Sequence, residues 1–406
     1  MIATPSPCGT FAAMSLTKII LKPGKEQSIK RFHPWVFSGA IQKTEGAAHD
    51  GDIVEVCDSK GAYLATGHCS EGSIAVRIFS FDGFDGSADF WVEKISNAYR
   101  LRKLLGFTDN ANTTIYRLIH GEGDGLPGLI VDIYGSTAVI QTHSAGMFEQ
   151  RAIIAEAILK TYGDTITAIF DRGDEKVGGK GTGTQGEYLL GSKHETVAIE
   201  HGCRFDVDWE GGQKTGFFID QRENRKLLGD FAKGKKVLNT FCYTGGFSVY
   251  ALKAGASLVH SLDSSQKALD LAVINAKLNG FEAPVHDIIK ADAVEYMKQL
   301  KEDYDIIVLD PPAFAKHLSA RHKAVQGYIR INEAAIKQIK PGGIIFTFSC
   351  SQVIDKKLFR DSIMAASINA RRKVRVLHQL HQPADHPVSI YHPEGEYLKG
   401  LVIEVE

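Results

Sequence analysis

The sequence predicts an α/β protein in which a doubly wound parallel sheet follows two smaller units. From about Gly216 onward, strand-like apolar runs alternate with helical segments, which is typical of a parallel sheet covered by helices on both faces. Before about Phe81, short alternating runs are separated by turn residues, which indicates a small β-barrel or sandwich. The 406 residues also exceed what a single hydrophobic core usually serves.

We therefore expect four segments: a disordered tail at 1–13, a β-barrel at 14–88, a middle α+β domain at 89–195, and an α/β domain with a leading hairpin at 196–406. The tail is small and polar, without the basic start and apolar core of a secretory signal. The patterned sequence begins at Met14, which leaves open whether translation starts at Met1 or Met14.

The composition excludes several classes of protein. Lys plus Arg number 47 against 48 for Asp plus Glu, so a nucleic acid could be bound only through local basic patches. No apolar run approaches the roughly 20 residues of a membrane helix, so we expect no membrane partner. The six cysteines show no CxxC spacing, so we expect no metal site and no disulfides, which fits the reducing cytoplasm.

Two runs of basic residues are candidates for such patches. The second run follows Phe314 and consists of Lys316, Arg321, Lys323, Arg330, Lys337 and Lys340. The first lies in the N-terminal barrel and includes Lys18, Lys22, Lys25, Lys30 and Arg31. A charged run by itself is more often a solvated face than a binding site.

The N-terminal barrel carries a first resemblance to a known family. Ile53–Cys57 and Ile74–Phe79 alternate as strands with one buried face do. The segments Leu21–Gly24, His33–Phe37 and Gly51–Val56 resemble a PUA domain, which is an RNA-binding β-barrel. The resemblance implies RNA binding, and the first basic run suits phosphate contacts, which supply affinity without reading sequence.

The middle domain is predicted to combine helices and strands. Helices are expected over Trp91–Leu105 and Met147–Tyr162, with strands near 116–119, 129–133 and 137–142 between them. The glycine-rich stretch Gly178–Gly191 lacks the Lys-Ser/Thr ending of a phosphate-binding loop, so we expect a flexible connector. Val197–Val207 alternates around a His201-Gly202 turn and predicts a hairpin.

The last domain shows five strand-like runs, each followed by a helical segment. The runs are Lys236–Phe241, Leu258–Asp263, Val285–Ile289, Asp305–Asp310 and Ile344–Ser349. The helices are expected over Phe247–Lys253, Ser265–Leu278, Ala293–Leu300, Ala324–Ile339 and Lys356–Asn369. Two late strands, near Val374–Leu380 and Leu398–Val405, are expected to complete the sheet.

Residues that follow these strands should form the site, because ligands of open α/β sheets bind at the carboxyl ends of the strands. The pair Gly245-Gly246 allows a ligand to approach the backbone closely. Tyr250 breaks the GxGxxG pattern of a dinucleotide site, which disfavours NAD as the ligand and leaves other adenosine-containing ligands open. Asp263 suits two ribose hydroxyls and Asp292-Ala293 an adenine amino group. A strand-end Asp alone is more often a helix cap.

The fourth and fifth strands end in two further motifs. Asp310-Pro311-Pro312-Ala313-Phe314 forms a rigid corner with few hydrogen-bond donors, which suits a flat base beside Phe314. Cys350 lies between two serines after the fifth strand; free cysteines are most often buried, but here the chain should emerge at the ligand edge. In the usual doubly wound strand order, Asp310 and Cys350 end neighbouring strands.

Together these motifs resemble class I S-adenosylmethionine (SAM) methyltransferases that make 5-methylcytosine in RNA. With the PUA-like start, the chain from about residue 16 to its end is similar to the large-subunit (23S) ribosomal RNA cytosine methyltransferases of the RlmI type. Phe217–Arg225, Asp385–Pro387 and Glu396–Gly400 also match. The resemblance implies SAM as cofactor, bound by Gln221, Arg222, Asn239, Phe241, Tyr243, Thr244, Gly245, Asp263, Asp292, Ala293 and Asp310, and RNA contacts at Phe314 and Lys316 as well as the first basic run.

The chemistry of this reaction independently requires a cysteine. Carbon 5 of cytosine is a poor nucleophile, and a thiolate that adds to carbon 6 converts the ring into an enamine able to accept a methyl group. Cys350 is the predicted nucleophile, and Asp310 would assist by hydrogen bonding at N3. Relatives often carry a second cysteine where this chain has Pro312-Ala313, so the base that removes the carbon 5 proton is unassigned. We interpret Cys242 as a packing residue.

Two alternatives remain at this point. The methyl acceptor could be an exocyclic amine, a ribose hydroxyl or a small molecule, none of which needs Cys350. A different class is a non-catalytic RNA-binding factor of ribosome assembly, which the paired glycines and three strand-end carboxylates oppose. The expected partner is ribosomal RNA before the large subunit is fully assembled, and a homodimer is left open.

Overall fold

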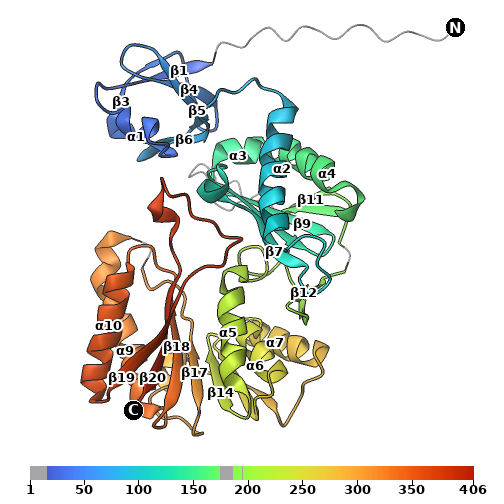
Figure 1. Ribbon diagram of the computed structural model, residues 1–406, viewed down its shortest axis with the longest axis vertical. Coiled ribbons are helices and arrows are strands. Elements are labelled where there is room, and N and C mark those ends of the chain that lie inside the picture. The colour runs from blue at the N-terminus through green and yellow to red at the C-terminus, as the bar shows by residue number, and fades with distance from the viewer. Residues whose placement is uncertain (1–15, 174–185, 194, 316) are drawn as a thin grey trace, which may run out of the picture.

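The computed structural model describes residues 16–173, 186–193, 195–315 and 317–406. The predicted tail at 1–13 lies outside the described residues. The three larger of the four described sheets follow one another along the long axis of the molecule, with the N-terminal sheet at one end and the C-terminal sheet at the other (Figure 1). A long segment of the C-terminal domain reaches back toward the N-terminal sheet (Figure 1).

The N-terminal sheet has six strands in the order β2-β6-β5-β4-β1-β3. Its elements are β1 (Thr17–Leu21), α1 (Gln27–Lys30), β2 (Trp35–Phe37), β3 (Ile41–Glu45), β4 (Ile53–Cys57), β5 (Tyr63–Cys69) and β6 (Ile74–Ser80). Strand β1 runs parallel to β4, and the other pairs are antiparallel. Ile19, Val54, Val56 and Val76 are buried in its core, so the alternating runs have one face inward as predicted.

The middle domain is a five-stranded sheet, in the order β11-β10-β9-β8-β7, covered by helices. Its elements are α2 (Ala88–Leu104), β7 (Ile115–His120), β8 (Leu129–Tyr134), β9 (Thr137–Thr142), α3 (Ala145–Glu149), α4 (Arg151–Tyr162), β10 (Ala168–Asp171) and β11 (Glu187–Leu190). Helix α2 packs on α4, and Trp91 and Ile95 of α2 are buried against the sheet.

Two predictions for this domain are corrected. The single helix expected over Met147–Tyr162 is interrupted at Gln150 and forms α3 and α4. The flexible connector expected at Gly178–Gly191 is wrong at its C-terminal end, because β11 pairs antiparallel with β10 there. The many glycines favoured a connector, and the strand Glu187–Leu190 is too short to be recognised from its residue pattern. Residues 178–185 lie outside the described part of the chain.

The predicted hairpin is confirmed, with β12 (Val197–Glu200) paired antiparallel to β13 (Cys203–Asp206). It leads into the C-terminal domain, a seven-stranded sheet in the order β16-β15-β14-β17-β18-β20-β19. The strands are β14 (Lys236–Thr240), β15 (Leu258–Asp263), β16 (His286–Lys290), β17 (Ile306–Leu309), β18 (Gly343–Ser349), β19 (Val374–Leu380) and β20 (Lys399–Val405). The first five are parallel, and β20 and β19 complete the sheet in antiparallel fashion.

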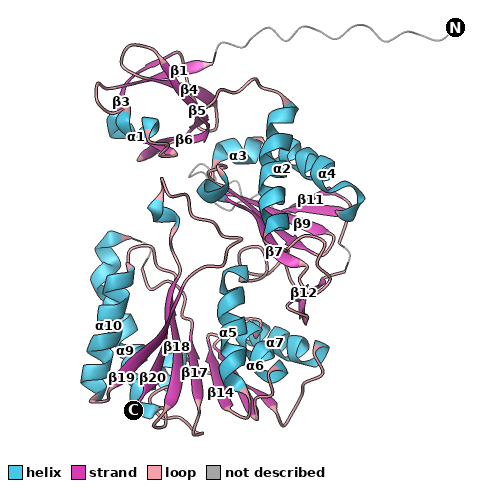
Figure 2. Ribbon diagram, viewed as in Figure 1, coloured by secondary structure: helices cyan, strands magenta, loops and turns pink. Residues whose placement is uncertain are grey.

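Helices cover both faces of this sheet (Figure 2). They are α5 (Arg222–Ala232), α6 (Gly246–Lys253), α7 (Gln266–Leu278), α8 (Ala293–Tyr296), α9 (Arg321–Gln338) and α10 (Lys356–Ala370). Successive strand residues alternate between the faces: Val237 packs in the core beside α5 and α6, and Leu238 in the core beside α9 and α10. Helix α8 is shorter than expected, and α5 was not predicted.

No helix in the described ranges is long and apolar enough to cross a membrane. In the same ranges, no group of His, Cys, Asp and Glu is arranged to hold a metal ion. The five described cysteines are Cys57, Cys69, Cys203, Cys242 and Cys350, and all are free thiols.

Candidate active site

A cleft of about 470 Å³ lies at the carboxyl ends of β14, β15, β17 and β18. Seven of the predicted site residues line it: Gln221, Phe241, Tyr243, Thr244, Asp263, Asp310 and Cys350. Neighbouring parallel strands place Asp310 after β17 and Cys350 after β18 at the same edge. The convergence expected from the strand order is therefore present.

The turn after β14 has an unusual backbone. Phe241 and Tyr243 adopt positive φ angles of 53° and 47°, a conformation that bulky residues rarely take. A Cβ atom on Gly245 (φ 77°) would stand 2.9 Å from Cβ of Ala272 on α7, so only glycine allows this close packing. The sequence predicted a close approach of the backbone at the paired glycines. At Gly245, the neighbour that comes close is helix α7.

Asp263 closes this turn from the next strand. Its carboxylate accepts hydrogen bonds from the backbone N–H groups of Tyr243 (3.1 Å) and Ser265 (2.9 Å). A carboxylate has more acceptor positions than these two bonds use, so Asp263 can still accept from a ligand in the cleft.

Four other predicted cofactor residues do not line the cleft. Asn239 is buried and donates to Oγ of Ser248 (2.9 Å), and Gly245 packs on α7 as described. Asp292 caps α8 by accepting from the N–H of Glu295 (2.9 Å). Ala293 packs in the hydrophobic core.

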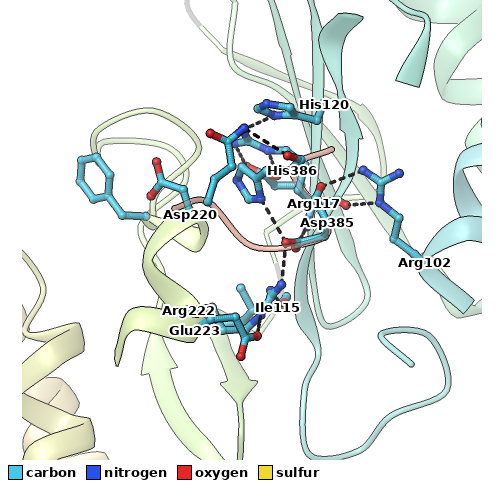
Figure 3. Close-up of polar contacts among 12 residues, drawn as sticks. Arg102, Ile115, Arg117, His120, Asp220, Arg222, Glu223, Asp385 and His386 are labelled. Carbon is cyan, nitrogen blue, oxygen red and sulfur yellow. Dashed lines mark hydrogen bonds and ion pairs between the residues drawn. The ribbon is translucent and has the colours of Figure 1, made fainter. Parts of the chain in front are cut away.

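Arg222 is also predicted to bind the cofactor, and its position corrects this prediction. Its guanidinium is fully buried outside the cleft lining, where it forms a 2.6 Å ion pair with Asp385 and stacks over the Phe107 ring. Figure 3 shows Asp385 at the centre of this network, between Arg222 and two arginines of the middle domain. Arg102 donates to its carbonyl oxygen, and the N–H of Arg117 donates to its carboxylate.

Burial alone would raise the pKa of Asp385, but Arg222 and His386 hold it well below its ordinary value. Arg102 and Arg117 each pair further with a buried carboxylate of the middle domain, Asp124 and Asp132. Paired in this way, buried charges are tolerated. Arg222 therefore joins the C-terminal domain to the middle domain instead of binding a ligand in the cleft.

Gln221 and Arg225 are one helical turn apart and both line the cleft. The amide of Gln221 donates to Oδ2 of Asp310 across 3.0 Å. Arg225 forms a two-point ion pair with Glu200 and donates to the carbonyl oxygen of Phe218. The floor of the cleft is thereby fixed by buried polar contacts.

Two carboxylates in the cleft have opposite pKa shifts. Burial, followed by repulsion from Asp220, raises the pKa of Asp310 to about 7. Burial also acts to raise the pKa of Asp220, but Lys214, His386 and a 2.8 Å hydrogen bond from Tyr397 bring it down to about 2. At neutral pH Asp220 carries the negative charge, and Asp310 is balanced between its two forms.

Cys350 is held on a short loop by its two serine neighbours. Ser349 donates to the hydroxyl of Tyr328 (2.9 Å), and Ser351 donates to the carbonyl oxygen of Ala315 (2.7 Å), which ties this loop to the one after Asp310. Lys399 is buried beside it and donates to the carbonyl oxygen of Ser351 (2.7 Å). Burial, with a further contribution from Asp310, raises the pKa of the Cys350 thiol.

Sequence reasoning missed Asp220, Lys214, Arg225 and Lys399 as site residues. Asp220 and Arg225 lie in the matched segment Phe217–Arg225, and Lys399 lies in Glu396–Gly400, so the motifs contained them without assigning a role. Burial lowers the pKa of Lys399 to about 8. Cys242 is buried against Leu269 and Ala272, in agreement with its interpretation as a packing residue.

The predicted RNA-contacting residues lie in two separate places. All five basic residues of the N-terminal run, from Lys18 to Arg31, are exposed. Phe314 is partly buried, with its ring 4.7 Å from that of Tyr328, and does not line the cleft. Lys316 lies outside the described residues.

Two family models match parts of the chain. Residues 181–392 match the family model of S-adenosylmethionine-dependent methyltransferases, and residues 19–81 match a PUA-like domain. The chain is 40% identical to ribosomal RNA large subunit methyltransferase I of Erwinia tasmaniensis, with 96% of this chain and 99% of that protein covered. It is 39% identical to the protein of the same name from Photobacterium profundum, over 96% and 100% of the two chains.

Among solved structures, a provisionally named SAM-dependent methyltransferase from Streptococcus mutans superposes with a TM-score of 0.82. The alignment covers 96% of this chain and 100% of that chain at 22% identity, which establishes a shared fold. A provisionally named methyltransferase solved in complex with SAH gives the same values.

Proposed function

The chain belongs to the ribosomal RNA large subunit methyltransferase I family and is a SAM-dependent methyltransferase, and from this premise we propose that it methylates carbon 5 of a cytosine in large-subunit ribosomal RNA. The observation that carries the proposal is the placement of Cys350 and Asp310 at the ends of neighbouring strands, both lining one cleft. Methylation of an amine or a hydroxyl would require neither a thiol nor this pairing.

The residues of the cleft fit SAM. Asp263 retains acceptor capacity for ribose hydroxyls, and Ala268 and Leu271 supply an apolar wall. One carboxylate oxygen of Asp220, Oδ1, is buried without a hydrogen-bond partner in the described chain, and a cationic group would satisfy it. Lys214 and Lys267 also line the cleft and could pair with a ligand carboxylate. When bound, SAM supplies a methyl group on a positively charged sulfur.

Cys350 acts as the nucleophile in the proposed mechanism. Its thiol first loses a proton, and the thiolate forms a bond to carbon 6 of cytosine, which makes carbon 5 nucleophilic. Carbon 5 then takes the methyl group. Removal of the carbon 5 proton by a base restores the ring double bond and expels the thiolate of Cys350. Burial raises the pKa of the Cys350 thiol and keeps it protonated in the free enzyme, so a base must take this proton once the RNA is bound.

Asp310 is proposed to hydrogen bond to N3 of the cytosine. Its pKa of about 7 means that a protonated, donating form is populated at neutral pH. Gln221 occupies one carboxyl oxygen of Asp310, and this leaves the other for the base. Repulsion between Asp220 and Asp310 disfavours ionisation of both carboxyl groups, and the negative charge resides on Asp220.

The test is methylation of protein-free large-subunit ribosomal RNA by the full chain, followed by mass spectrometry of the digested nucleosides. We expect 5-methylcytidine with the wild-type protein and none with Cys350→Ala. RNA containing 5-fluorocytidine should trap a covalent protein–RNA adduct, because fluorine at carbon 5 cannot leave as a proton. Methylation at an amine or ribose position without an adduct would overturn the proposal.

The same assay on assembled large subunits tests the time of action. We propose that the protein acts before the subunit is fully assembled, in the cytoplasm where ribosomes are made. Its target is then accessible in free RNA and protected in the finished subunit. Equal methylation of both substrates would contradict this part of the proposal.

A further inference from the structure

Four exposed apolar side chains lie where the N-terminal sheet meets the C-terminal domain. Phe32 (50% exposed) lies in the turn after α1 and Phe37 (48%) ends β2, and Ile390 (86%) and Tyr391 (51%) belong to the segment between β19 and β20. We call these four residues the joint surface. Figure 1 shows the C-terminal segment rising from its sheet toward the N-terminal one. Exposed apolar groups gathered in one place indicate an interaction site.

The two halves of the joint surface are in contact. The ring of Phe32 lies 5.3 Å from that of Tyr391, and the ring of Trp35 lies 4.3 Å from that of His392. Trp35 also donates to Oε1 of Glu122 in the middle domain (2.9 Å). The joint surface is therefore continuous across domains that are far apart in sequence, and it exists only while they are docked.

The backbone at Phe32 is strained in a way that presents its ring. Its φ of 63° lies in the left-handed region, which is costly for a bulky side chain. Phe81 supports the ring by an edge contact at 5.3 Å, yet half of the side chain stays in solvent. Strain of this kind tends to be retained at functional positions.

The N-terminal side of the joint surface is basic. Phe37 lines a hollow of about 320 Å³ together with Leu21, Lys25 and Ile29. Lys30 and Arg31 are exposed on and after α1, directly before Phe32. Among the described residues from Leu16 to Glu45, the acidic side chains are Glu26 and Glu45, and Glu45 is paired with Lys43 at 2.7 Å. The N-terminal side of the joint surface is therefore positively charged and suits a polyanion, while Glu122 lies beside Trp35 and Glu394 beside His392.

We propose that the joint surface stacks unpaired bases of an RNA strand whose phosphates lie along Lys25, Lys30 and Arg31. Aromatic side chains can stack on any base, and basic side chains between them bind the phosphates of the RNA backbone. Proteins bind single strands without sequence preference in this way. Bases of a duplex are already stacked on one another and are not available. This inference rests on the proposed function only in taking RNA as the substrate.

RNA bound in this way would bear on the catalytic cleft. Tyr391 is followed, within the same segment, by Leu398, which lines the cleft. The next residue, Lys399, begins β20 and holds the Cys350 loop. A strand stacked across both domains would fix this segment, so the joint surface would position the RNA and the cleft relative to each other.

Binding of a fluorescent polyuridine strand to the full chain, followed by anisotropy, tests the proposal. Stacking on one ring typically contributes enough that Phe37→Ala and Tyr391→Ala should each weaken binding about 5-fold or more. A matched duplex should bind these variants as it binds the wild type. Ile368→Ala is the control, because Ile368 on α10 is 66% exposed and lies outside the joint surface. Unchanged single-strand affinity, or an equal loss on the duplex, would overturn the proposal.

A second measurement does not depend on the variants folding normally. Photo-crosslinking of wild-type protein to a 5-bromouridine strand should give crosslinks both within 32–37 and within 388–392. Crosslinks confined to one domain would contradict a two-domain surface. Neither experiment includes SAM or measures turnover. Their results therefore test RNA binding at the joint surface independently of the proposed methylation of carbon 5.

Discussion

Nε2 of Gln221 donates to Oδ2 of Asp310 across 3.0 Å, and this bond joins the residue that directly precedes α5 to the end of β17. It places a neutral donor beside a carboxyl group whose pKa is raised to about 7 by burial and by Asp220. A carboxyl held in this state is favourable for chemistry at neutral pH and unfavourable for stability, since its charged form is poorly solvated.

We therefore predict that Asp310→Asn stabilises the protein in a pH-dependent way. Because the pKa of Asp310 is above its ordinary 3.8 when folded, its contribution to stability is present below pH 3.8 and lost as pH rises through about 7. The advantage of the variant should grow between these values. Urea unfolding at pH 5 and pH 8 measures this, with the exposed Asp303→Asn as control. The same gain at both pH values would be inconsistent with a raised pKa.

Cys350→Ala should abolish methylation while SAM affinity stays within a few-fold of wild type. The thiol is proposed to attack the base, so the cofactor contacts survive its removal. Turnover and calorimetry measure the two quantities separately. Cys69→Ala, in β5 and far from the cleft lining, is the control. Turnover near the wild-type rate in Cys350→Ala would remove the covalent mechanism.

Asp263→Ala should weaken SAM binding by roughly 1–3 kcal/mol, the usual cost of losing hydrogen bonds to a charged acceptor. Calorimetry with SAM measures it. The variant also loses the contacts to Tyr243 and Ser265, so Asp263→Asn, which keeps an acceptor, should lose less. Unchanged affinity in both variants would mean that Asp263 only holds the turn.

Arg222→Met should lower the free energy of unfolding by about 3–5 kcal/mol, because it leaves Asp385 charged and buried without its partner. Combining it with Asp385→Asn should cost less than the sum of the two single changes. Arg375→Met, which removes an exposed pair with Glu404, should cost no more than about 1 kcal/mol. Additive effects of the two buried changes would show that the ion pair does not couple the domains.

Neutralising Lys25 and Lys30 to Gln should flatten the dependence of log affinity on log salt by about 2 for ribosomal RNA, since each phosphate contact releases a counterion. Lys357 and Lys373, which are 86% and 88% exposed in the C-terminal domain, give the matched control pair. An unchanged slope would make the basic run after Phe314 the better candidate for phosphate binding.

The sequence by itself determined the C-terminal sheet and the part of the site built on its strands. Five apolar runs predicted five parallel strands, and parallel strands bring their carboxyl ends to one edge whatever else the chain does. Asp263 and Asp310 end two of these runs, Cys350 follows a third, and all three residues line the cleft. Predicting their convergence needed the strand type, which local patterns indicate, and the usual strand order of a doubly wound sheet, which the structure has.

Tertiary structure alone decided what the remaining side chains contact. Gln221 directly precedes α5 and lies one helical turn from Arg225, and both line the cleft, whereas Arg222 meets Asp385 and the middle domain. Because α5 was not predicted, its faces could not be assigned. Arg102 and Asp385 are in contact although 283 positions separate them, and Phe32 meets Tyr391 in the same way. Such contacts depend on how whole domains dock. Residue patterns report only the few neighbouring positions of one helix or strand, so they could not predict these contacts.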